Sequence, residues 1–329
     1  MSKIVKYGLI STAEIGFSAH LPGAKTSQNS EIVAVSSRSQ ESAQAAAREH
    51  GIPLAFGSYQ EMIDSDEIDA VINTLPNSMH HEWTIKAAKA GKHILCEKPL
   101  SASMAEAREM AAVAKENDVV LVEGFTPRWN LQMQKIRQLI ADGAIGDIIR
   151  IDSCLTFTRN DLNDIRFSKE LAGGSMMDAG GYAVYAARFA MGIEPKLAMG
   201  FDRKRAGIGV DTTFSGLLRF PCGAVANVWS SLEGPPQLPF TAYGTKGTIY
   251  LEQSFDENIP VVLDRGGVQE KIELNSINRF QVQIDEFSEC VLTNKAPKFP
   301  VEDAIKNMAA ILALYKSAQT GKAIEVDQM

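Results

Sequence analysis

The sequence predicts two domains, a doubly wound α/β domain followed by a domain built on an antiparallel sheet. Three observations support this prediction. The chain has 329 residues, about twice the usual size of one domain. Short apolar runs alternate with helical segments up to Gly124, whereas beyond Phe125 such runs follow one another with turn residues between them. The first pattern is typical of parallel sheets covered by helices, and the second is typical of antiparallel sheets.

In the first 124 residues the apolar runs are short and nearly uninterrupted, as in strands that are buried on both faces. The expected strands are Ile4–Ile10, Ile32–Ser36, Ala70–Leu75, His93–Glu97 and Val119–Glu123. The expected helices are Ser39–His50, Ser78–Ala90 and Ser101–Asn117. Each helix begins near a residue able to cap it, and Gly51 and Gly91 stand where two of them end. This alternation predicts βαβ units with right-handed crossovers.

The remaining residues predict a sheet flanked by a few helices. The expected strands are Lys196–Arg203, Thr212–Phe220, Ala224–Ser231, Phe240–Tyr243 and Thr248–Leu251, with glycines and prolines between them. The expected helices are Leu131–Asp142, Gly181–Met191, Phe280–Leu292 and Val301–Thr320. We therefore predict one domain over residues 1–124 and a second over residues 125–329.

Composition and charge exclude several classes of protein. Lys and Arg number 33 against 40 Asp and Glu, a net charge of −7 without any long basic run. Such a chain lacks the basic patch that a nucleic acid or an anionic membrane requires, and it has no uncharged apolar stretch long enough to span a bilayer. The first residues do not form a secretory signal, so we expect a cytoplasmic protein. The spacing of the four cysteines and five histidines predicts neither a disulfide framework nor a metal site.

The turn after the first expected strand is a candidate phosphate-binding turn. It stands where dinucleotide-binding folds carry G-x-G-x-x-G, although only the last glycine is kept. The residues of this turn expected to contact a cofactor are Ser11, Thr12, Ala13, Ile15 and Gly16. Ser and Ala are the smallest replacements for glycine, and a hydroxyl could donate a hydrogen bond to a phosphate. The alternative is an ordinary turn from a strand into a helix.

The end of the second expected strand indicates which cofactor would bind. A site for NAD has an acidic residue here to bind the ribose 2′-hydroxyl. This sequence has Ser37 and Arg38 instead. A guanidinium can bind a 2′-phosphate that a carboxylate would repel, so the sequence favours NADP(H) over NAD(H). The alternative is a solvated surface arginine at the start of a helix.

Two more segments follow the ends of expected parallel strands, where open α/β sheets bind their ligands. The candidate cofactor contacts in them are Leu75, Pro76, Asn77 and His80 by the third of those strands and Glu97 and Lys98 at the end of the fourth. A lysine at this edge can donate to a substrate hydroxyl. Lys98 could also be a surface cation, and His80 could be a satisfied histidine at the start of a helix.

Four segments in this order resemble one family. They are the strand followed by S-T-A-x-I-G, the P-N-x-x-H segment, the E-K-P segment and Gly173-Gly174-Ser175-Met176-Met177-Asp178-Ala179-Gly180-Gly181-Tyr182. Together they are similar to the glucose–fructose oxidoreductase/inositol dehydrogenase (Gfo/Idh/MocA) family of NAD(P)-dependent oxidoreductases. The resemblance covers nearly the whole chain. It implies an α/β Rossmann domain followed by an α+β domain with a large open, mainly antiparallel sheet.

The resemblance also implies the chemistry. Its members react at carbinol and carbonyl groups of carbohydrates and polyols, and Lys98, Asp178 and Tyr182 stand at their catalytic positions. Many members have His at the last of these positions. Tyr182 makes the chain similar to the branch of glucose–fructose oxidoreductase, dimeric dihydrodiol dehydrogenase and xylose dehydrogenase. The resemblance implies a cis peptide bond before Pro99 and a homodimer or homotetramer.

The predicted function is therefore hydride transfer between NADP(H) and a sugar, polyol or cyclic diol, with Tyr182 as acid/base. The alternatives are a ketoreductase of nucleotide-linked deoxysugars and a non-catalytic NADP-binding regulator on the same fold. Candidate substrate contacts are Arg128, Trp129 and Asn160, with Asp161 and Arg166 in the same polar stretch as Asn160.

Overall fold

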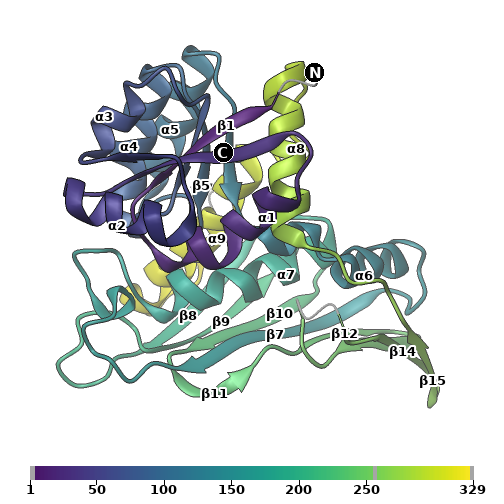
Figure 1. Cartoon of the computed structure of the whole chain (residues 1–329). Coiled ribbons are helices and arrows are strands. Elements are labelled where there is room, and N and C mark those ends of the chain that lie inside the picture. The colour runs from purple at the N-terminus through teal and green to yellow at the C-terminus, as the bar shows by residue number, and fades with distance from the viewer. Residues whose placement is uncertain (1–3, 255–257, 327–329) are drawn as a thin grey trace. The chain divides into compact units, whose positions relative to one another are not determined.

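The computed structural model describes residues 4–254 and 258–326. Its contacts divide the chain into two compact units (Figure 1). The first unit comprises Met1–Thr126 and Asn278–Ile305, and the second comprises Pro127–Ile277 and Lys306–Met329. The first transition lies within a few residues of the expected boundary at Gly124. The sequence placed all of 125–329 in the second domain, whereas residues 278–305 group with the first unit.

The first unit contains a parallel sheet in the order β3-β2-β1-β4-β5-β6. Its strands are β1 (Val5–Ile10), β2 (Ser30–Ser36), β3 (Leu54–Phe56), β4 (Ala70–Asn73), β5 (His93–Glu97) and β6 (Leu121–Gly124). Its helices are α1 (Leu21–Thr26), α2 (Gln40–His50), α3 (Tyr59–Ile63), α4 (His80–Lys89), α5 (Met104–Glu116) and α8 (Arg279–Thr293). The predicted doubly wound sheet is thus confirmed, and its strand order reverses at β1. The short β3 and α3 were not predicted.

The helix α8 belongs to this unit because its side chains and backbone pack against the start of the chain. It lies beside α1 in Figure 1. A Cβ on Gly23 would lie 3.0 Å from the backbone of Phe280, so any larger residue would crowd this approach. Phe287 is buried in the apolar core with β1, and the Tyr7 hydroxyl lies 2.6 Å from the Ser288 hydroxyl. Sequence order hides this packing, because α1 and α8 are far apart in the chain.

The second unit is built on a sheet in the order β15-β14-β13-β12-β7-β10-β9-β8-β16, with β11 also paired to β7. The strands are β7 (Ile148–Thr158), β8 (Leu197–Arg203), β9 (Thr213–Arg219), β10 (Val225–Ser231), β11 (Glu233–Gln237), β12 (Phe240–Gly244), β13 (Gly247–Leu251), β14 (Val261–Arg265), β15 (Val268–Ile272) and β16 (Ile324–Glu325). The helices are α6 (Leu131–Ala141), α7 (Gly181–Met191) and α9 (Val301–Thr320), the last beginning in the first unit. The β7–β10 pair is parallel and the other pairs are antiparallel, which confirms the mainly antiparallel sheet.

One face of this sheet packs against helices. Cβ atoms on Gly200 and Gly216 would meet Leu314 of α9 within 2.5–2.6 Å, counting its backbone oxygen and side chain. The central strand β7 was not predicted from the sequence, because Arg150 and Asp152 interrupt its apolar residues on the other face. In the described ranges, no helix is long and apolar enough to cross a membrane. Over those same ranges, His, Cys, Asp and Glu form no group of three or more that could hold a metal ion.

Candidate functional site

The turn after β1 stands where the strand order of the first sheet reverses. Ser11 has φ = +91°, a backbone conformation that favours glycine. Its hydroxyl accepts from the Ala13 N–H at 3.2 Å and lies 2.9 Å from Thr74 Oγ1. The Thr74 hydroxyl in turn donates to the Ile10 carbonyl at 2.8 Å. Hydrogen bonds from the serine side chain therefore hold a turn that glycine usually forms.

The helical segment after this turn begins close to β1. It contains a π-helical turn, Gly16–His20, which continues into α1. A Cβ on Gly16 would lie 3.3 Å from Leu9 of β1. Close packing of helix on strand is the role of the last glycine in a dinucleotide-binding turn. Thr12 is exposed, and Ala13 and Ile15 are partly exposed. A tight turn and a closely packed helix are the features that a dinucleotide needs here, so these residues fit the cofactor.

The end of β2 presents a cation beside this turn. Ser37 is partly exposed and its N–H donates to the Phe56 carbonyl at 3.1 Å. Arg38 is exposed, and its charge acts on Tyr59, whose pKa is raised by burial and lowered less by Arg38. Ser39 caps α2 by accepting from the Ser42 N–H at 3.2 Å. An exposed guanidinium one strand from the turn fits a 2′-phosphate.

The loop after β5 carries Lys98 and is fixed by buried polar groups. The Lys98–Pro99 peptide bond is cis, as predicted. Before it, Glu97 Oε1 lies 2.7 Å from His20 Nε2, and the His20 side chain is 1% exposed. After it, the Leu100 N–H donates to Glu123 Oε1 at 2.9 Å. The sequence predicted Glu97 and Lys98 but gave no indication that His20 and Glu123 hold their loop.

His80 joins this loop to the one after β4. It is fully buried, with Nδ1 2.8 Å from the Pro99 carbonyl and Nε2 2.7 Å from the Leu75 carbonyl. Burial lowers the pKa of His80, and the two carbonyl contacts oppose that effect. Both ring nitrogens thus face carbonyl oxygens of the chain's own backbone. Pro76 and Asn77, in the loop between these contacts, are partly exposed.

The second unit carries the Gly-Gly segment and its two candidate catalytic residues. Asp178 lies in a π-helical turn, Met176–Gly180, and Tyr182 lies in the first turn of α7 that follows directly. Four residues separate them, about one helical turn, and both are partly exposed. Asp178 Oδ2 accepts from Arg166 Nε at 2.7 Å. The structure therefore brings Asp178 and Arg166 together within this unit.

A buried carboxylate fixes the start of this helix. Asp211 is 2% exposed and accepts from the Ser175 hydroxyl at 2.7 Å, the Met176 N–H at 2.8 Å and the Tyr315 hydroxyl at 2.7 Å. Burial and the Asp211 charge raise the pKa of Tyr315 well above its usual value. Gly174 has φ = +120°, and a Cβ there would lie 2.3 Å from Asp211 Oδ1. Sequence reasoning missed Asp211, since a single Asp before a strand carries no pattern.

The expected substrate contacts are only partly gathered. The Arg128 guanidinium lies 5.9 Å from the centre of the Tyr185 ring of α7, and Trp129 is 7% exposed. Asn160 and Asp161 are exposed residues beyond the end of β7. Lys98 belongs to the first unit, whereas Asp178 and Tyr182 belong to the second. Their meeting across a shared site stays a prediction.

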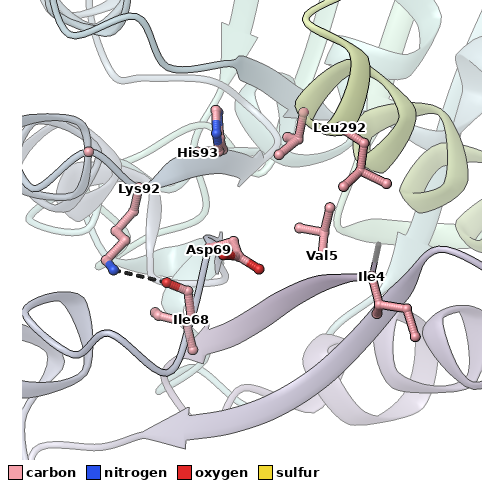
Figure 2. A pocket seen from close by; sticks show the side chains of 9 residues that line it. Ile4, Val5, Ile68, Asp69, Lys92, His93 and Leu292 are labelled. Atoms are coloured by element: carbon pink, nitrogen blue, oxygen red, sulfur yellow. Dashed lines mark hydrogen bonds between the residues drawn. The ribbon is translucent and has the colours of Figure 1, made fainter. Parts of the chain in front are cut away.

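A cavity of about 400 Å³ lies elsewhere in the first unit (Figure 2). Its lining residues are Ile4, Val5, Ile68, Asp69, Gly91, Lys92, His93, Val291 and Leu292. Strands β1 and β5 begin at this cavity, so it lies at the amino edge of the sheet. Lys92 Nζ donates to the Ser65 and Ile68 carbonyls at 2.7 and 2.9 Å. The Lys92 ammonium group therefore binds backbone carbonyls of the fold itself. The cavity is separate from the candidate cofactor site, which lies at the carboxyl edge of the sheet.

Sequence profiles agree with the geometry of both units. The profile of the oxidoreductase family with an NAD-binding Rossmann fold matches residues 5–125. The profile of the GFO/IDH/MocA C-terminal domain matches residues 133–250. The chain belongs to the Gfo/Idh/MocA family of oxidoreductases. The resemblance inferred from the four segments is therefore confirmed.

Individual relatives of this Gfo/Idh/MocA chain are enzymes. It is 34% identical to D-xylose 1-dehydrogenase (NADP(+)) 2 of Haloferax volcanii, over 98% of this chain and 99% of the other. Aldose-aldose oxidoreductase from Caulobacter crescentus, crystallised with glycerol, has a TM-score of 0.91 at 27% identity, covering 98% and 100% of the two chains. A 3-ketoreductase from Actinomadura kijaniata, in complex with NADP and TDP-benzene, has a TM-score of 0.91 at 25% identity, covering 96% and 98%. These names favour an enzyme over the non-catalytic regulator.

Proposed function

We propose that the chain transfers hydride between NADP(H) and a carbinol or carbonyl carbon of a sugar, polyol or cyclic diol. The observation that carries the proposal is the hydrogen-bonded carboxyl edge of the first sheet. There the Ser11 turn is tied to Thr74, and His80 ties the following loop to the one that carries Lys98. This edge is where open α/β sheets bind their ligands. Similarity to an NADP-dependent xylose dehydrogenase over nearly the whole chain supports the same function.

The first unit would bind the cofactor through a few local groups despite the net charge of −7. Residues 11–16 would approach the pyrophosphate at the start of the helix. Ser37 and Arg38 would bind the 2′-phosphate, while Leu75, Pro76, Asn77 and Glu97 would line the nicotinamide half. His80 would act by holding two of these loops rather than by touching the cofactor. The bound nicotinamide supplies or accepts the hydride.

The second unit would supply the proton and orient the substrate. Tyr182 would donate a proton to the carbonyl oxygen during reduction, or accept it from the hydroxyl during oxidation. Lys98 would stabilise the tyrosinate by its charge and donate to the substrate oxygen. The Asp178 carboxylate would accept a hydrogen bond from a second substrate hydroxyl. Arg128, Trp129 and Asn160 are the outer contacts that we propose for the substrate.

The test is steady-state kinetics of the whole chain with four cofactors: NADPH, NADP⁺, NADH and NAD⁺. Each is paired with free sugars, dicarbonyls, cyclic diols and nucleotide sugars, and turnover is followed by the absorbance of the reduced nicotinamide. We expect turnover with at least one free sugar or diol, and a higher kcat/KM with the phosphorylated cofactor. Absence of turnover on every substrate, or a preference for NAD(H), would contradict the proposal.

A second candidate substrate class is the nucleotide-linked keto sugar. One observation favours it, namely the likeness to a 3-ketoreductase crystallised with NADP and a TDP compound. In the second unit, Arg159 is exposed and pairs with Asp164. Arg166 pairs with both Asp164 and Asp178, so a chain of ion pairs links Arg159 to Asp178. The Arg159 guanidinium, 46% exposed and 3.8 Å from Asp164, would be the cation that contacts a diphosphate. A kcat/KM at least tenfold higher for a TDP-linked ketosugar than for any free sugar would favour this candidate.

We also propose that two copies pair through the open face of the second sheet. Phe201, Leu217 and Tyr243 are 62%, 44% and 40% exposed. Strand registers put them on one face, opposite the face that α9 covers. Burying such a patch stabilises an oligomer. Sedimentation should give a dimer or tetramer, and Phe201→Glu with Leu217→Glu should shift it toward the monomer; a monomeric parent chain would contradict this.

A further inference from the structure

We propose that Arg166 is a positioning residue that holds the Asp178 carboxylate in the orientation in which it binds substrate. The inference rests on the proposed function, because it concerns how Asp178 performs its role there. Arg166 lies in a short turn, Ile165–Phe167, that the Gly-Gly segment follows a few residues later. All the groups involved belong to the second unit, so the argument depends on geometry within one compact body.

The contact between the two side chains is a direct ion pair. Arg166 Nε donates to Asp178 Oδ2 at 2.7 Å, and Arg166 Nη1 donates to Asp164 Oδ1 at 3.1 Å. Burial opposes the guanidinium charge, but Asp178 and Asp164 outweigh it and raise the pKa of Arg166. Hydrogen bonds between charged groups are shorter and stronger than neutral ones. One guanidinium therefore binds two carboxylates.

The backbone beneath this pair is fixed as well. The Gly174 N–H donates to the Arg166 carbonyl at 2.8 Å, and the Gly173 N–H donates to the Ser168 carbonyl at 2.8 Å. A Cβ on Gly173 would lie only 2.4 Å from the Arg166 carbonyl oxygen. Any side chain there would push the Arg166 turn away from the helix that carries Asp178. The first glycine of the pair, Gly173, is thus explained by the close approach that brings Arg166 to Asp178.

Asp178 is the last residue of a chain of ion pairs in which positive and negative side chains alternate. Arg159 Nε lies 3.8 Å from Asp164 Oδ2, and Asp164 is followed by Arg166 and then by Asp178. Asp164 and Asp178 are only 19% and 15% exposed, so solvent screens the inner pairs less than it would at an open surface. Arg166 thus holds the Asp178 carboxylate through Oδ2. The carboxylate can then accept a hydrogen bond from a substrate hydroxyl without first reorganising.

A double-mutant cycle tests whether Arg166 acts through Asp178. We would measure kcat and KM for Arg166→Gln, Asp178→Asn, the double variant and Arg166→Lys, with NADPH affinity and thermal unfolding of each. Arg166→Gln should lower kcat/KM by about 10- to 100-fold, the loss of one charge-assisted bond of roughly 1.5–3 kcal/mol. It should show the same division between kcat and KM as Asp178→Asn. In the Asp178→Asn chain the further loss should be less than about threefold.

The controls separate positioning from general damage. Arg166→Lys keeps the charge and should recover part of the lost kcat/KM. Arg265→Gln removes an exposed arginine of β14 that pairs with Glu270 at 3.5 Å, and it should change kcat/KM by less than about twofold. Additive losses from Arg166→Gln and Asp178→Asn would overturn the inference, as would loss of NADPH affinity in Arg166→Gln. Failure of the proposed function is seen separately, because the unsubstituted chain would then show no turnover and the positioning role would fall with it.

Discussion

Two helix starts in this molecule have the same backbone plan and different chemistry. In the first unit a turn with positive φ at Ser11 leads into the π-helical segment Gly16–His20 and then α1. In the second unit a turn with positive φ at Gly174 leads into the π-helical segment Met176–Gly180 and then α7. Short π-helical segments of this kind are frequent at functional sites. Each unit has therefore placed one at its candidate site.

The two starts differ in the side chain that accepts a hydrogen bond from the backbone beside each of them. At the first, a neutral hydroxyl from Ser11 accepts from the Ala13 N–H. At the second, the buried carboxylate of Asp211 accepts from the Met176 N–H and two hydroxyls. A helix start favours negative charge, so the first suits an anion from a ligand, whereas the second already has its own anion. The difference suggests a start that binds phosphate and a start that orients side chains.

The largest expected effect on stability comes from Gly174→Ala, which crowds the helix start that Asp211 holds. The new Cβ would lie 2.3 Å from Asp211 Oδ1 and 2.8 Å from the Tyr315 hydroxyl, at φ = +120°. Overpacking and a left-handed alanine together should cost about 2–5 kcal/mol of unfolding free energy in urea. Gly223→Ala is the control. Gly223 also has a positive φ, but a Cβ there would meet no atom within 4 Å, so the substitution should cost about 1 kcal/mol. Equal losses of unfolding free energy in the two variants would mean that the contacts of Asp211 do not stabilise this helix start.

Arg38→Ala tests whether the cofactor that we assign to the first unit carries a 2′-phosphate. Loss of the guanidinium should weaken NADP(H) binding by about 10- to 100-fold and NAD(H) binding by less than about twofold. Fluorescence titration of each reduced cofactor measures both affinities. Arg48→Ala, an exposed arginine in the last turn of α2, should leave both unchanged. Similar losses for the two cofactors would contradict the 2′-phosphate assignment.

Substitutions of Ser11 should separate its hydrogen bonds from its backbone strain. Alanine loses the hydroxyl but keeps a Cβ at φ = +91°, whereas glycine loses the hydroxyl and relieves the strain. Ser11→Ala should therefore be less stable to urea than Ser11→Gly by about 1–2 kcal/mol. If the two variants unfold at the same urea concentration, the serine is not strained.

The smallest expected effect is the pH dependence of the free energy of unfolding that His80 contributes. Because the pKa of His80 is lowered in the folded state, the unfolded chain binds the proton first as the pH falls below about 6.5. Stability contributed by neutral His80 is thus present above that pH and declines below it. The free energy of unfolding should fall between pH 7.5 and pH 5.5, and its slope against pH should be shallower in His80→Gln. His93, whose pKa is also lowered, keeps its share in both chains, so an unchanged slope would exclude His80 as a source.

Local patterns were enough to predict the parallel strands other than β3, the helices α2, α4 and α5 and the α7 helix, because apolar periodicity and capping residues are properties of neighbouring residues. The motif segments likewise pointed to the family. Long-range pairings were beyond such reasoning. The α8 helix packs on the first unit through Gly23, and Asp211 caps a helix 36 residues away in the chain. The strand β7 was missed because one of its faces carries polar residues.

The same limit applies to the candidate site. Arg166 and Asp178 were both singled out, but nothing in their spacing of 12 residues predicted an ion pair. His20 lies in the first helical segment and Glu97 is the last residue of β5, yet their side chains are in contact. Side chains that hold other side chains leave no local signal, because their partners come from elsewhere in the fold.

The most direct test of the account is Tyr182→Phe in the whole chain. The substitution removes only the hydroxyl, and Tyr182 lies in the unit that the account assigns to the substrate rather than to the cofactor. NADPH affinity should therefore stay within about twofold, while kcat/KM on the best sugar or diol should fall by about 10²–10⁴, the usual share of acid–base catalysis. A turnover within about tenfold of the unsubstituted chain would contradict the claim that this tyrosine moves the proton.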